Sequence, residues 1–144
     1  FAHIMGIALP KVALLAAVET VSANMPSTID AAALCKMAQR DQIKGGLLDG
    51  PLAFDNAISP ESVRIKHIHS EVAGDADILV VPDLESGNML GKLLEYLAGA
   101  TTSGLVLGAR VPIALTSRAD TVNARIASAL LAKLVAMHRR STKI

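Results

Sequence analysis

The sequence is poor in aromatic residues, which make up only 2% of its 144 positions. The aromatic residues are Phe1, Phe54 and Tyr96, and tryptophan is absent. So few rings cannot form a base-stacking surface for nucleic acid or an aromatic belt at a membrane interface. We therefore expect neither nucleic acid nor a membrane among the partners of this protein.

An excess of charge is also lacking, because 14 Lys and Arg face 13 Asp and Glu, for a formal net charge of +1. No long-range field is available to gather polyanions or anionic lipid. The single cysteine, Cys35, cannot close an intrachain disulfide. This fits a reducing compartment.

Long hydrophobic runs are missing too, since the longest, residues 12–18, is far below the roughly 18 residues of a spanning helix. The sequence is nevertheless 51% hydrophobic and 19% charged, which is enough to build the core of one soluble domain. The chain begins with Phe1, and no basic cluster precedes an apolar stretch. We expect a part or a processed product of a longer protein.

Short apolar runs bounded by turn residues alternate with helical patterns. Such runs are typical of strands buried on both faces of a parallel sheet. The runs are 11–18, 46–49, 77–81, 103–107 and 112–115. The alternation predicts an α/β fold, with one open, mostly parallel sheet flanked by helices and residues 1–144 forming a single α/β unit.

Four helices are expected between and after these runs. Ser27 with Asp30 resembles a capping box that opens a helix over 27–40, and Ser59-Pro60-Glu61 is a strong helix start. Apolar stripes at helical spacing predict the other two helices. These stripes are Met89, Leu90, Leu93, Leu94 and Leu97, before Gly99, and Ile126, Leu130, Leu134 and Met137.

Polar residues follow each expected strand, where open α/β sheets bind their ligands. The candidate substrate-binding residues there are Asp49, Asp55, Asp83, Glu85, Asn88, Arg110 and Thr116, and the candidate catalytic residues are Ser117, Arg118 and Asp120.

The segment 116–120 combines hydroxyls, a guanidinium and a carboxylate at a strand-to-helix junction. The guanidinium of Arg118 suits phosphate oxygens, the Ser117 hydroxyl can donate to a developing negative charge, and the Asp120 carboxylate can accept a proton. Alternatively, Asp120 only caps the following helix and Arg118 is a surface residue.

The segment 83–88 runs from a strand through a glycine into a helix, whose first amides could meet an anionic ligand. Asp83 and Glu85 could equally serve only as helix caps. Beside His67 and His69 only Glu71 lies at the spacing of a metal ligand, so a metal site is not expected. Cys35 is interpreted as a small packed side chain rather than a nucleophile.

Six segments in order resemble the phosphate acetyl/butyryl transferase family. They are PKVALL (10–15), MPST (25–28), DGPLAFD (49–55), VPDLESGN (81–88), LGARVPI (107–113) and TSRAD (116–120). The resemblance implies a fold like that of isocitrate and isopropylmalate dehydrogenases, in a two-domain, usually homodimeric, cytoplasmic bacterial enzyme of about twice this length. This chain would be the second domain plus a C-terminal return segment, without the N-terminal domain.

The resemblance also implies the activity, which is transfer of an acetyl or butyryl group between coenzyme A and inorganic phosphate through a ternary complex. Coenzyme A would be a substrate, with no tightly bound cofactor and no metal. Ser117 and Arg118 match the family's paired Ser-Arg. The acetyl-specific branch carries an aspartate where this sequence has Ala124, so Asp120 becomes the candidate base.

The family's further phosphate-binding arginines belong to the N-terminal domain, so this part of the protein is expected to be inactive alone. Two alternatives are a non-catalytic half that dimerises or binds nucleotide, and a dehydrogenase relative of the same fold. No Gly-x-Gly-x-x-Gly follows a strand, which disfavours a dinucleotide site.

Overall fold

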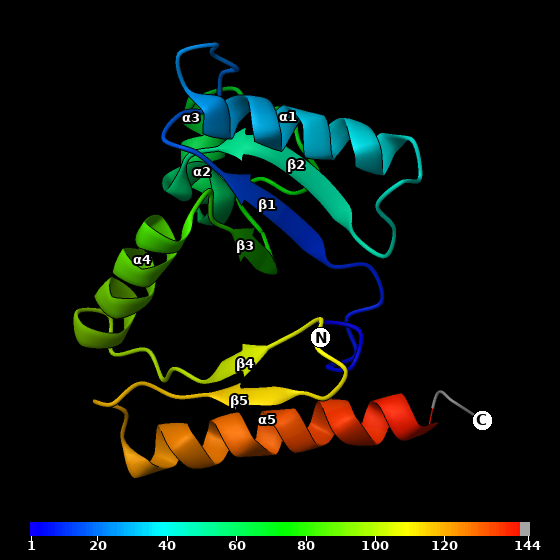
Figure 1. Cartoon of the computed structure of the whole chain (residues 1–144). Coiled ribbons are helices and arrows are strands. Elements are labelled where there is room, and N and C mark those ends of the chain that lie inside the picture. The colour runs from blue at the N-terminus through cyan, green and yellow to red at the C-terminus, as the bar shows by residue number, and fades with distance from the viewer. Residues whose placement is uncertain (142–144) are drawn as a thin grey trace. The chain divides into compact units, whose positions relative to one another are not determined.

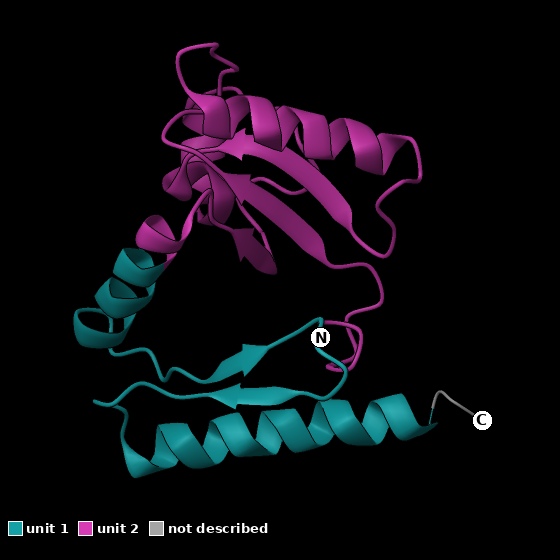
Figure 2. Cartoon of the chain, viewed as in Figure 1, with its two compact units in different colours: residues 1, 88–144 teal, residues 2–87 magenta. Residues whose placement is uncertain are grey.

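The computed structural model describes residues 1–141 and divides the chain into two compact units (Figures 1 and 2). The larger unit contains residues 2–87, and the smaller contains residue 1 together with the chain from residue 88. The sequence predicts that residues 1–144 form one α/β unit, the second domain and return segment of a larger enzyme. That place in a larger enzyme stays a prediction.

The larger unit is built around a parallel sheet in the order β2-β1-β3. These strands are β1 (Lys11–Leu15), β2 (Leu47–Leu52) and β3 (Ile78–Val80), and β1 pairs in parallel with both neighbours. Ala13, Leu14 and Leu15 are buried, so the central strand forms the core. The predicted α/β class with a helix-flanked parallel sheet is confirmed for this unit.

β1 and β2 approach very closely at Gly50, where the peptide bond to Pro51 is cis. A Cβ at position 50 would lie 2.6 Å from Leu14 Cβ and 2.7 Å from the Leu14 carbonyl oxygen. Only glycine fits between the two backbones there. β1 itself ends at Leu15, so the predicted strand over 11–18 is too long. The Ala16 amide still donates to the Leu52 carbonyl oxygen at 2.9 Å, and residues 17–20 then form bends.

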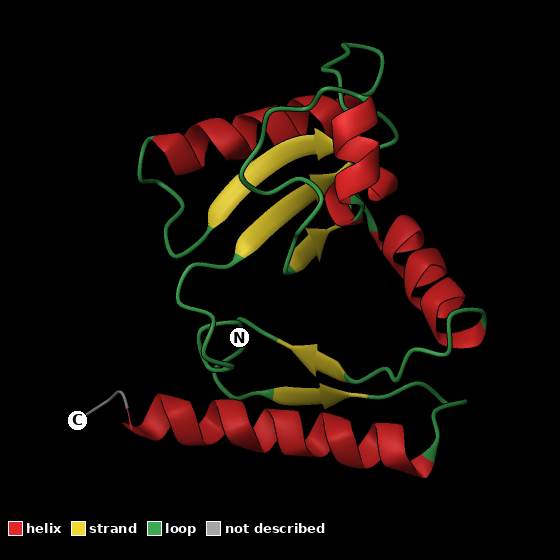
Figure 3. Cartoon of the chain, turned by 180° about the vertical axis from the view of Figure 1, so that it is seen from behind, coloured by secondary structure: helices red, strands yellow, loops and turns green. Residues whose placement is uncertain are grey.

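Three helices flank this sheet (Figure 3): α1 (Pro26–Gln39), α2 (Phe54–Ile58) and α3 (Pro60–Ile65). α1 packs mainly on β2. α3 begins as predicted, with Pro60 in its first turn and the Ser59 side chain accepting from the Ser62 amide. The predicted cap at Ser27 is wrong, because α1 begins at Pro26 and position 25, a methionine, makes no side-chain cap bond.

The smaller unit consists of an antiparallel pair, β4 (Gly104–Val106) and β5 (Ile113–Leu115), with α5 (Val122–Ser141) packed on it (Figure 1). The prediction that these two strands join one mostly parallel sheet is wrong. They form their own two-stranded sheet. The connection 107–112 is too short for the dozen or so residues that a parallel crossover requires.

The helix α4 (Leu84–Tyr96) begins in the larger unit and continues into the smaller one (Figure 2). Its predicted end is confirmed, since Gly99 adopts a left-handed φ of 67° just beyond the last turn. The apolar stripes of α4 and α5 are real but largely exposed, with Leu97 at 81% and Leu130 at 58%.

Candidate functional site

The segment from Thr116 to Asp120 forms a turn between β5 and α5. The Asp120 amide donates to the Ser117 carbonyl oxygen at 3.2 Å. The Ser117 amide in turn donates to Asp120 Oδ2 at 2.6 Å. Asp120 therefore closes the turn twice, with its backbone amide as a donor and its carboxylate as an acceptor. We call residues 117–120 the Ser-Arg loop.

The helix cap lies one residue beyond this loop. Thr121 Oγ1 accepts from the Ala124 amide at 3.2 Å, and α5 begins at Val122. The alternative that Asp120 is the N-cap is thus wrong. The Asp120 carboxylate accepts from a loop amide and not from an amide of the first helical turn. Short acidic side chains commonly stabilise turns in this way, as well as helix starts.

The functional groups of the Ser-Arg loop are accessible to a ligand. Thr116, Ser117 and Arg118 are exposed, and Asp120 is half-buried. Within residues 1–141 the Arg118 guanidinium takes part in no hydrogen bond or ion pair. An exposed guanidinium without an acidic partner keeps its bidentate donor edge for a phosphate.

Lys92 on α4 is a second cation that interacts electrostatically with Asp120. Its pKa is raised, first by the hydrogen bond to Glu95, and also by charge interactions that include Asp120. The ammonium lies 2.8 Å from Glu95 Oε2 and 5.5 Å from the centre of the Tyr96 ring. Sequence reasoning missed Lys92, because no local pattern links it to residue 120.

Arg110 is not brought to the Ser-Arg loop. The carboxyl ends of parallel strands share one edge of a sheet, and the candidates were grouped on that basis. β4 and β5 are antiparallel, however, so the loop after β4 with Arg110 and the loop after β5 with Thr116 lie at opposite ends of the hairpin.

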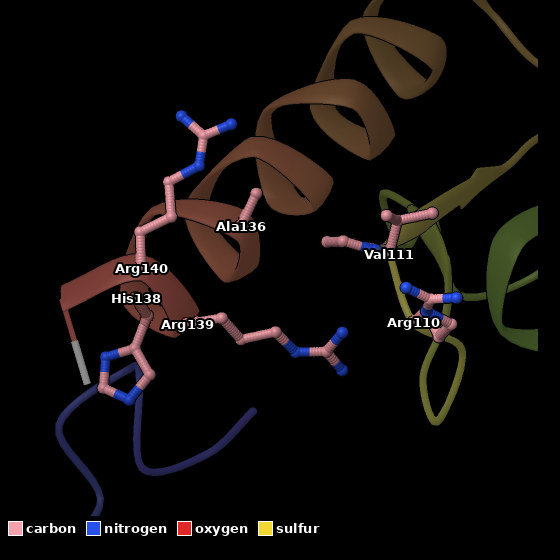
Figure 4. A pocket seen from close by; sticks show the side chains of 7 residues that line it. Arg110, Val111, Ala136, His138, Arg139 and Arg140 are labelled. Atoms are coloured by element: carbon pink, nitrogen blue, oxygen red, sulfur yellow. The ribbon is translucent and has the colours of Figure 1, made fainter. Parts of the chain in front are cut away.

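Arg110 instead lines a separate open cavity of about 590 Å³ (Figure 4). Arg139 on α5 also lines it and donates from Nη1 to the Ala109 carbonyl oxygen at 2.9 Å. In Figure 4 the Arg140 side chain extends away from Arg110, so the cations do not converge on one point.

In the larger unit, Asp55 belongs to a polar cluster at the carboxyl ends of β1 and β2. Lys66 Nζ lies 3.2 Å from Asp55 Oδ2 and 3.5 Å from Glu19 Oε2. The hydrogen bond to Lys66 lowers the pKa of Asp55, and the same bond raises the pKa of Lys66. Asn56 is fully buried and donates to Glu19 Oε2 at 3.1 Å. Lys66 and Asn56 were missed by sequence reasoning.

Two further candidate carboxylates of the larger unit accept hydrogen bonds from nearby backbone amides. Asp49 Oδ1 accepts from the Gly50 amide at 2.8 Å. Asp83 Oδ1 accepts from the Ser86 amide at 2.7 Å, and this bond lowers the pKa of Asp83. Asp83 therefore caps α4, as one of the two interpretations held, while Glu85 and Asn88 are exposed on that helix.

Cys35 shows the character of a packed thiol. Its Sγ lies 3.5 Å from the Gly50 carbonyl oxygen. Burial, followed by the charge of Asp49, raises the pKa of Cys35 to about 11. A thiol with so high a pKa is a poor nucleophile near neutral pH.

Residues 1–141 contain neither a metal-binding cluster nor a membrane-spanning helix. No group of three or more His, Cys, Asp or Glu side chains there could hold a metal ion. No helix among these residues has the length and apolar character needed to cross a bilayer.

Known proteins share both the sequence and the fold. The chain is 64% identical to the phosphate acetyltransferase of Rhizobium meliloti over 97% of its own length and 44% of that protein. It is 52% identical to the probable phosphate butyryltransferase of Bacillus subtilis, over 91% of its length and 44% of the relative. A branched-chain phosphotransacylase from Enterococcus faecalis V583 matches its fold with a TM-score of 0.81 at 37% identity, over 92% of this chain and 48% of that one.

The chain thus spans less than half the length of these relatives. The family model described as phosphate acetyl/butaryl transferase matches residues 1–133, which include every candidate site residue. On this match and on the identities to the relatives, the chain belongs to the phosphate acetyl/butyryl transferase family.

Proposed function

We propose that the full-length protein containing this chain transfers a short acyl group between coenzyme A and inorganic phosphate. A phosphate oxygen attacks the thioester carbonyl carbon, the carbon–sulfur bond breaks, and acyl phosphate and the thiolate of coenzyme A leave. In the reverse direction the thiol loses a proton and its sulfur attacks the acyl carbon of the acyl phosphate. The bond from that carbon to the phosphate oxygen breaks, and inorganic phosphate leaves. The single observation that carries the proposal is the Ser-Arg loop, in a chain that belongs to this family.

Each side chain of the loop has a distinct task. The free guanidinium of Arg118 binds the phosphoryl oxygens through two parallel hydrogen bonds. The Ser117 hydroxyl donates to the oxygen or sulfur on which negative charge develops. Asp120 Oδ2 holds the Ser117 amide, and the carboxylate accepts the thiol proton when coenzyme A attacks.

Other polar groups are assigned to substrate binding. Thr116 adjoins the loop and can donate to phosphate. In the larger unit, the proposed binding residues are the carboxylates that follow the strands, namely Asp49, Asp55, Asp83 and Glu85. Asn88, on the part of α4 that belongs to the smaller unit, is a further proposed binding residue. Arg110 stays a proposed binding residue for an anionic part of coenzyme A, at a place apart from the Ser-Arg loop.

The exposed apolar stripes of α4 and α5 support the view that a larger assembly covers them. We propose a cytoplasmic homodimer whose subunits also contain an N-terminal domain with further phosphate-binding arginines. The proposed two-domain architecture is like that of isocitrate and isopropylmalate dehydrogenases. Light scattering of this chain at micromolar concentration tests self-association, and a monodisperse monomer would argue against it.

A coupled assay tests the proposed activity. The full-length protein is incubated with acetyl- or butyryl-CoA, with and without phosphate, and released thiol is measured. We expect turnover that depends on phosphate, and little turnover by residues 1–144 alone. Absence of phosphate-dependent turnover with every acyl chain up to valeryl would favour a half that only dimerises or binds nucleotide. NAD-dependent oxidation of a hydroxy acid would favour the dehydrogenase relative.

A further inference from the structure

Arg125 extends from the first turns of α5 back to the Ser-Arg loop. Its Nη2 donates to the Arg118 carbonyl oxygen at 3.1 Å and to the Ser117 carbonyl oxygen at 3.5 Å. Its Nε donates to the Asp120 carbonyl oxygen at 3.3 Å. One guanidinium thus contacts the backbone of all three residues proposed to act on substrate.

The acceptors are all main-chain oxygens, which distinguishes Arg125 from an ordinary surface arginine. A surface arginine on a helix commonly pairs with a carboxylate, as Arg64 does with Glu61 in α3. Arg125 instead satisfies three carbonyl groups of a turn that lies beside the helix. Binding these carbonyls fixes the orientation of the peptide planes between residues 117 and 120, and therefore the directions of their side chains.

Hydrogen bonds within the loop also fix its shape, from the Asp120 amide to the Ser117 carbonyl oxygen at 3.2 Å and from the Ala119 amide to Ser117 Oγ at 3.5 Å. The Asp120 carboxylate holds the Ser117 amide, and Thr121 starts the helix that follows. The side chains of Ser117 and Arg118 are exposed, so packing does not hold them. The guanidinium of Arg125 is the part of α5 that ties this loop to a rigid element.

We propose that Arg125 is a positioning residue for acyl transfer, which holds Ser117, Arg118 and Asp120 in their reactive arrangement. This inference rests on the proposed function. Arg125 touches no substrate in this role. A planar fork with several donors suits the three carbonyls, whereas a lysine ammonium is more compact and reaches fewer of them at once.

The test uses the full-length protein with Arg125→Ala, Arg125→Lys and the control Lys133→Ala, which removes an exposed cation farther along α5. We expect Arg125→Ala to lower kcat about tenfold or more and to raise the KM for phosphate, since a displacement of about 1 Å can cost 10²-fold. The KM for acyl-CoA and the melting temperature should change little. Arg125→Lys should lie between Arg125→Ala and wild type, and Lys133→Ala should match wild type.

Cleavage by trypsin after Arg118 gives a readout that does not need activity. Mass spectrometry should detect faster cleavage there in Arg125→Ala than in wild type or Lys133→Ala, because the loop is released. Unchanged cleavage together with kcat and KM values within twofold of wild type would overturn the proposal. A general loss of melting temperature, with both KM values moving together, would also overturn it in favour of a purely structural role.

The two hypotheses fail in different ways. If wild type shows no phosphate-dependent turnover, the proposed function fails. Faster cleavage in Arg125→Ala would then still show that Arg125 orders the loop, but its role in acyl transfer would be overturned. If wild type is active and the variant equals it, only the role of Arg125 fails.

Discussion

In the unit formed by residues 2–87, the middle strand of the sheet is covered by its neighbours. Ala13 is fully buried and Leu14 is 4% exposed. In the smaller unit, all of β5 is exposed, with Leu115 at 59%. The larger unit thus has a closed core of its own, whereas the smaller one leaves much apolar surface uncovered.

The two units therefore differ in their proposed roles, because the buried core lies mainly in the larger unit and the proposed catalytic residues lie in the smaller one. The proposed catalytic loop follows β5, in the unit with the thinner core. Its backbone is ordered by polar contacts, namely those of Asp120, Thr121 and Arg125. Changes in the buried core of the larger unit should therefore affect mainly stability, while changes in the Ser-Arg loop should affect mainly rate.

The largest expected effect is on rate. Asp120→Asn in the full-length protein should lower kcat about 10²-fold or more, because an amide is not a general base. The amide oxygen can still accept from Ser117, so the melting temperature should hold. Kinetics and thermal unfolding check this, with Asp75→Asn, an exposed carboxylate of the other unit, as control. An Asp120→Asn variant within threefold of wild type would remove Asp120 as the base.

The next effect is on stability. Leu52→Ala, at a position that is 2% exposed, should cost about 2–5 kcal/mol of unfolding free energy. Leu115→Ala on β5 should change it by no more than about 0.5 kcal/mol in this chain. Urea unfolding of both variants checks the pair. Equal losses would show that the two units are not packed as differently as the exposures indicate.

The third effect is on the stability of the smaller unit, where a single buried hydroxyl group links α5 to β4. Ser128 is fully buried, and its Oγ accepts from the Gly104 amide at 3.0 Å while donating to the Ala124 carbonyl oxygen. Ser128→Ala leaves that amide without this acceptor and should cost about 1–3 kcal/mol. Ser141→Ala, at an exposed hydroxyl, is the control in chemical unfolding. Equal, small losses would mean that α5 and β4 do not depend on this bond.

The smallest effect concerns the pair of Lys66 and Asp55. The pKa of Asp55 is lowered, so its contribution is present above the ordinary value of 3.8 and is lost as pH falls through the folded value. The pKa of Lys66 is raised, so its contribution holds below 10.5 and is lost as pH rises further. Lys66→Met should therefore lower Tm by at most about 3 °C near neutral pH, and less at pH 3.

Thermal unfolding across the pH range checks this prediction, with the exposed Lys44→Met as control. A Tm difference between Lys66→Met and wild type that grows toward pH 3 would contradict the assignment of the pair.

Much of the fold could be predicted where a local signal exists. Ser59-Pro60 begins α3, and Gly99 follows the end of α4, because caps and left-handed glycines act within a few residues. The antiparallel pairing of β4 and β5 was missed, since three apolar residues do not specify direction. The length of 107–112 was the signal that could have shown it.

The candidate site divides in the same way. The segment 116–120 could be predicted from its own residues and from a family resemblance. Arg125, Lys92 and Lys66 could not, because their roles depend on which turn or carboxylate the fold places beside them. The prediction that Arg110 lies beside residues 116–120 was wrong because it assumed that β4 and β5 are parallel. In the antiparallel pair, the loop that carries Arg110 lies at the other end of the strands.

The Ser-Arg loop is proposed above all to bind the phosphoryl oxygens through Arg118. The most direct measurement is kcat/KM for phosphate in the full-length protein with Arg118→Lys, alongside its melting temperature. A lysine keeps the charge and loses the bidentate fork, so we predict a fall of about tenfold or more with an unchanged Tm. A value within twofold of wild type would contradict the claim.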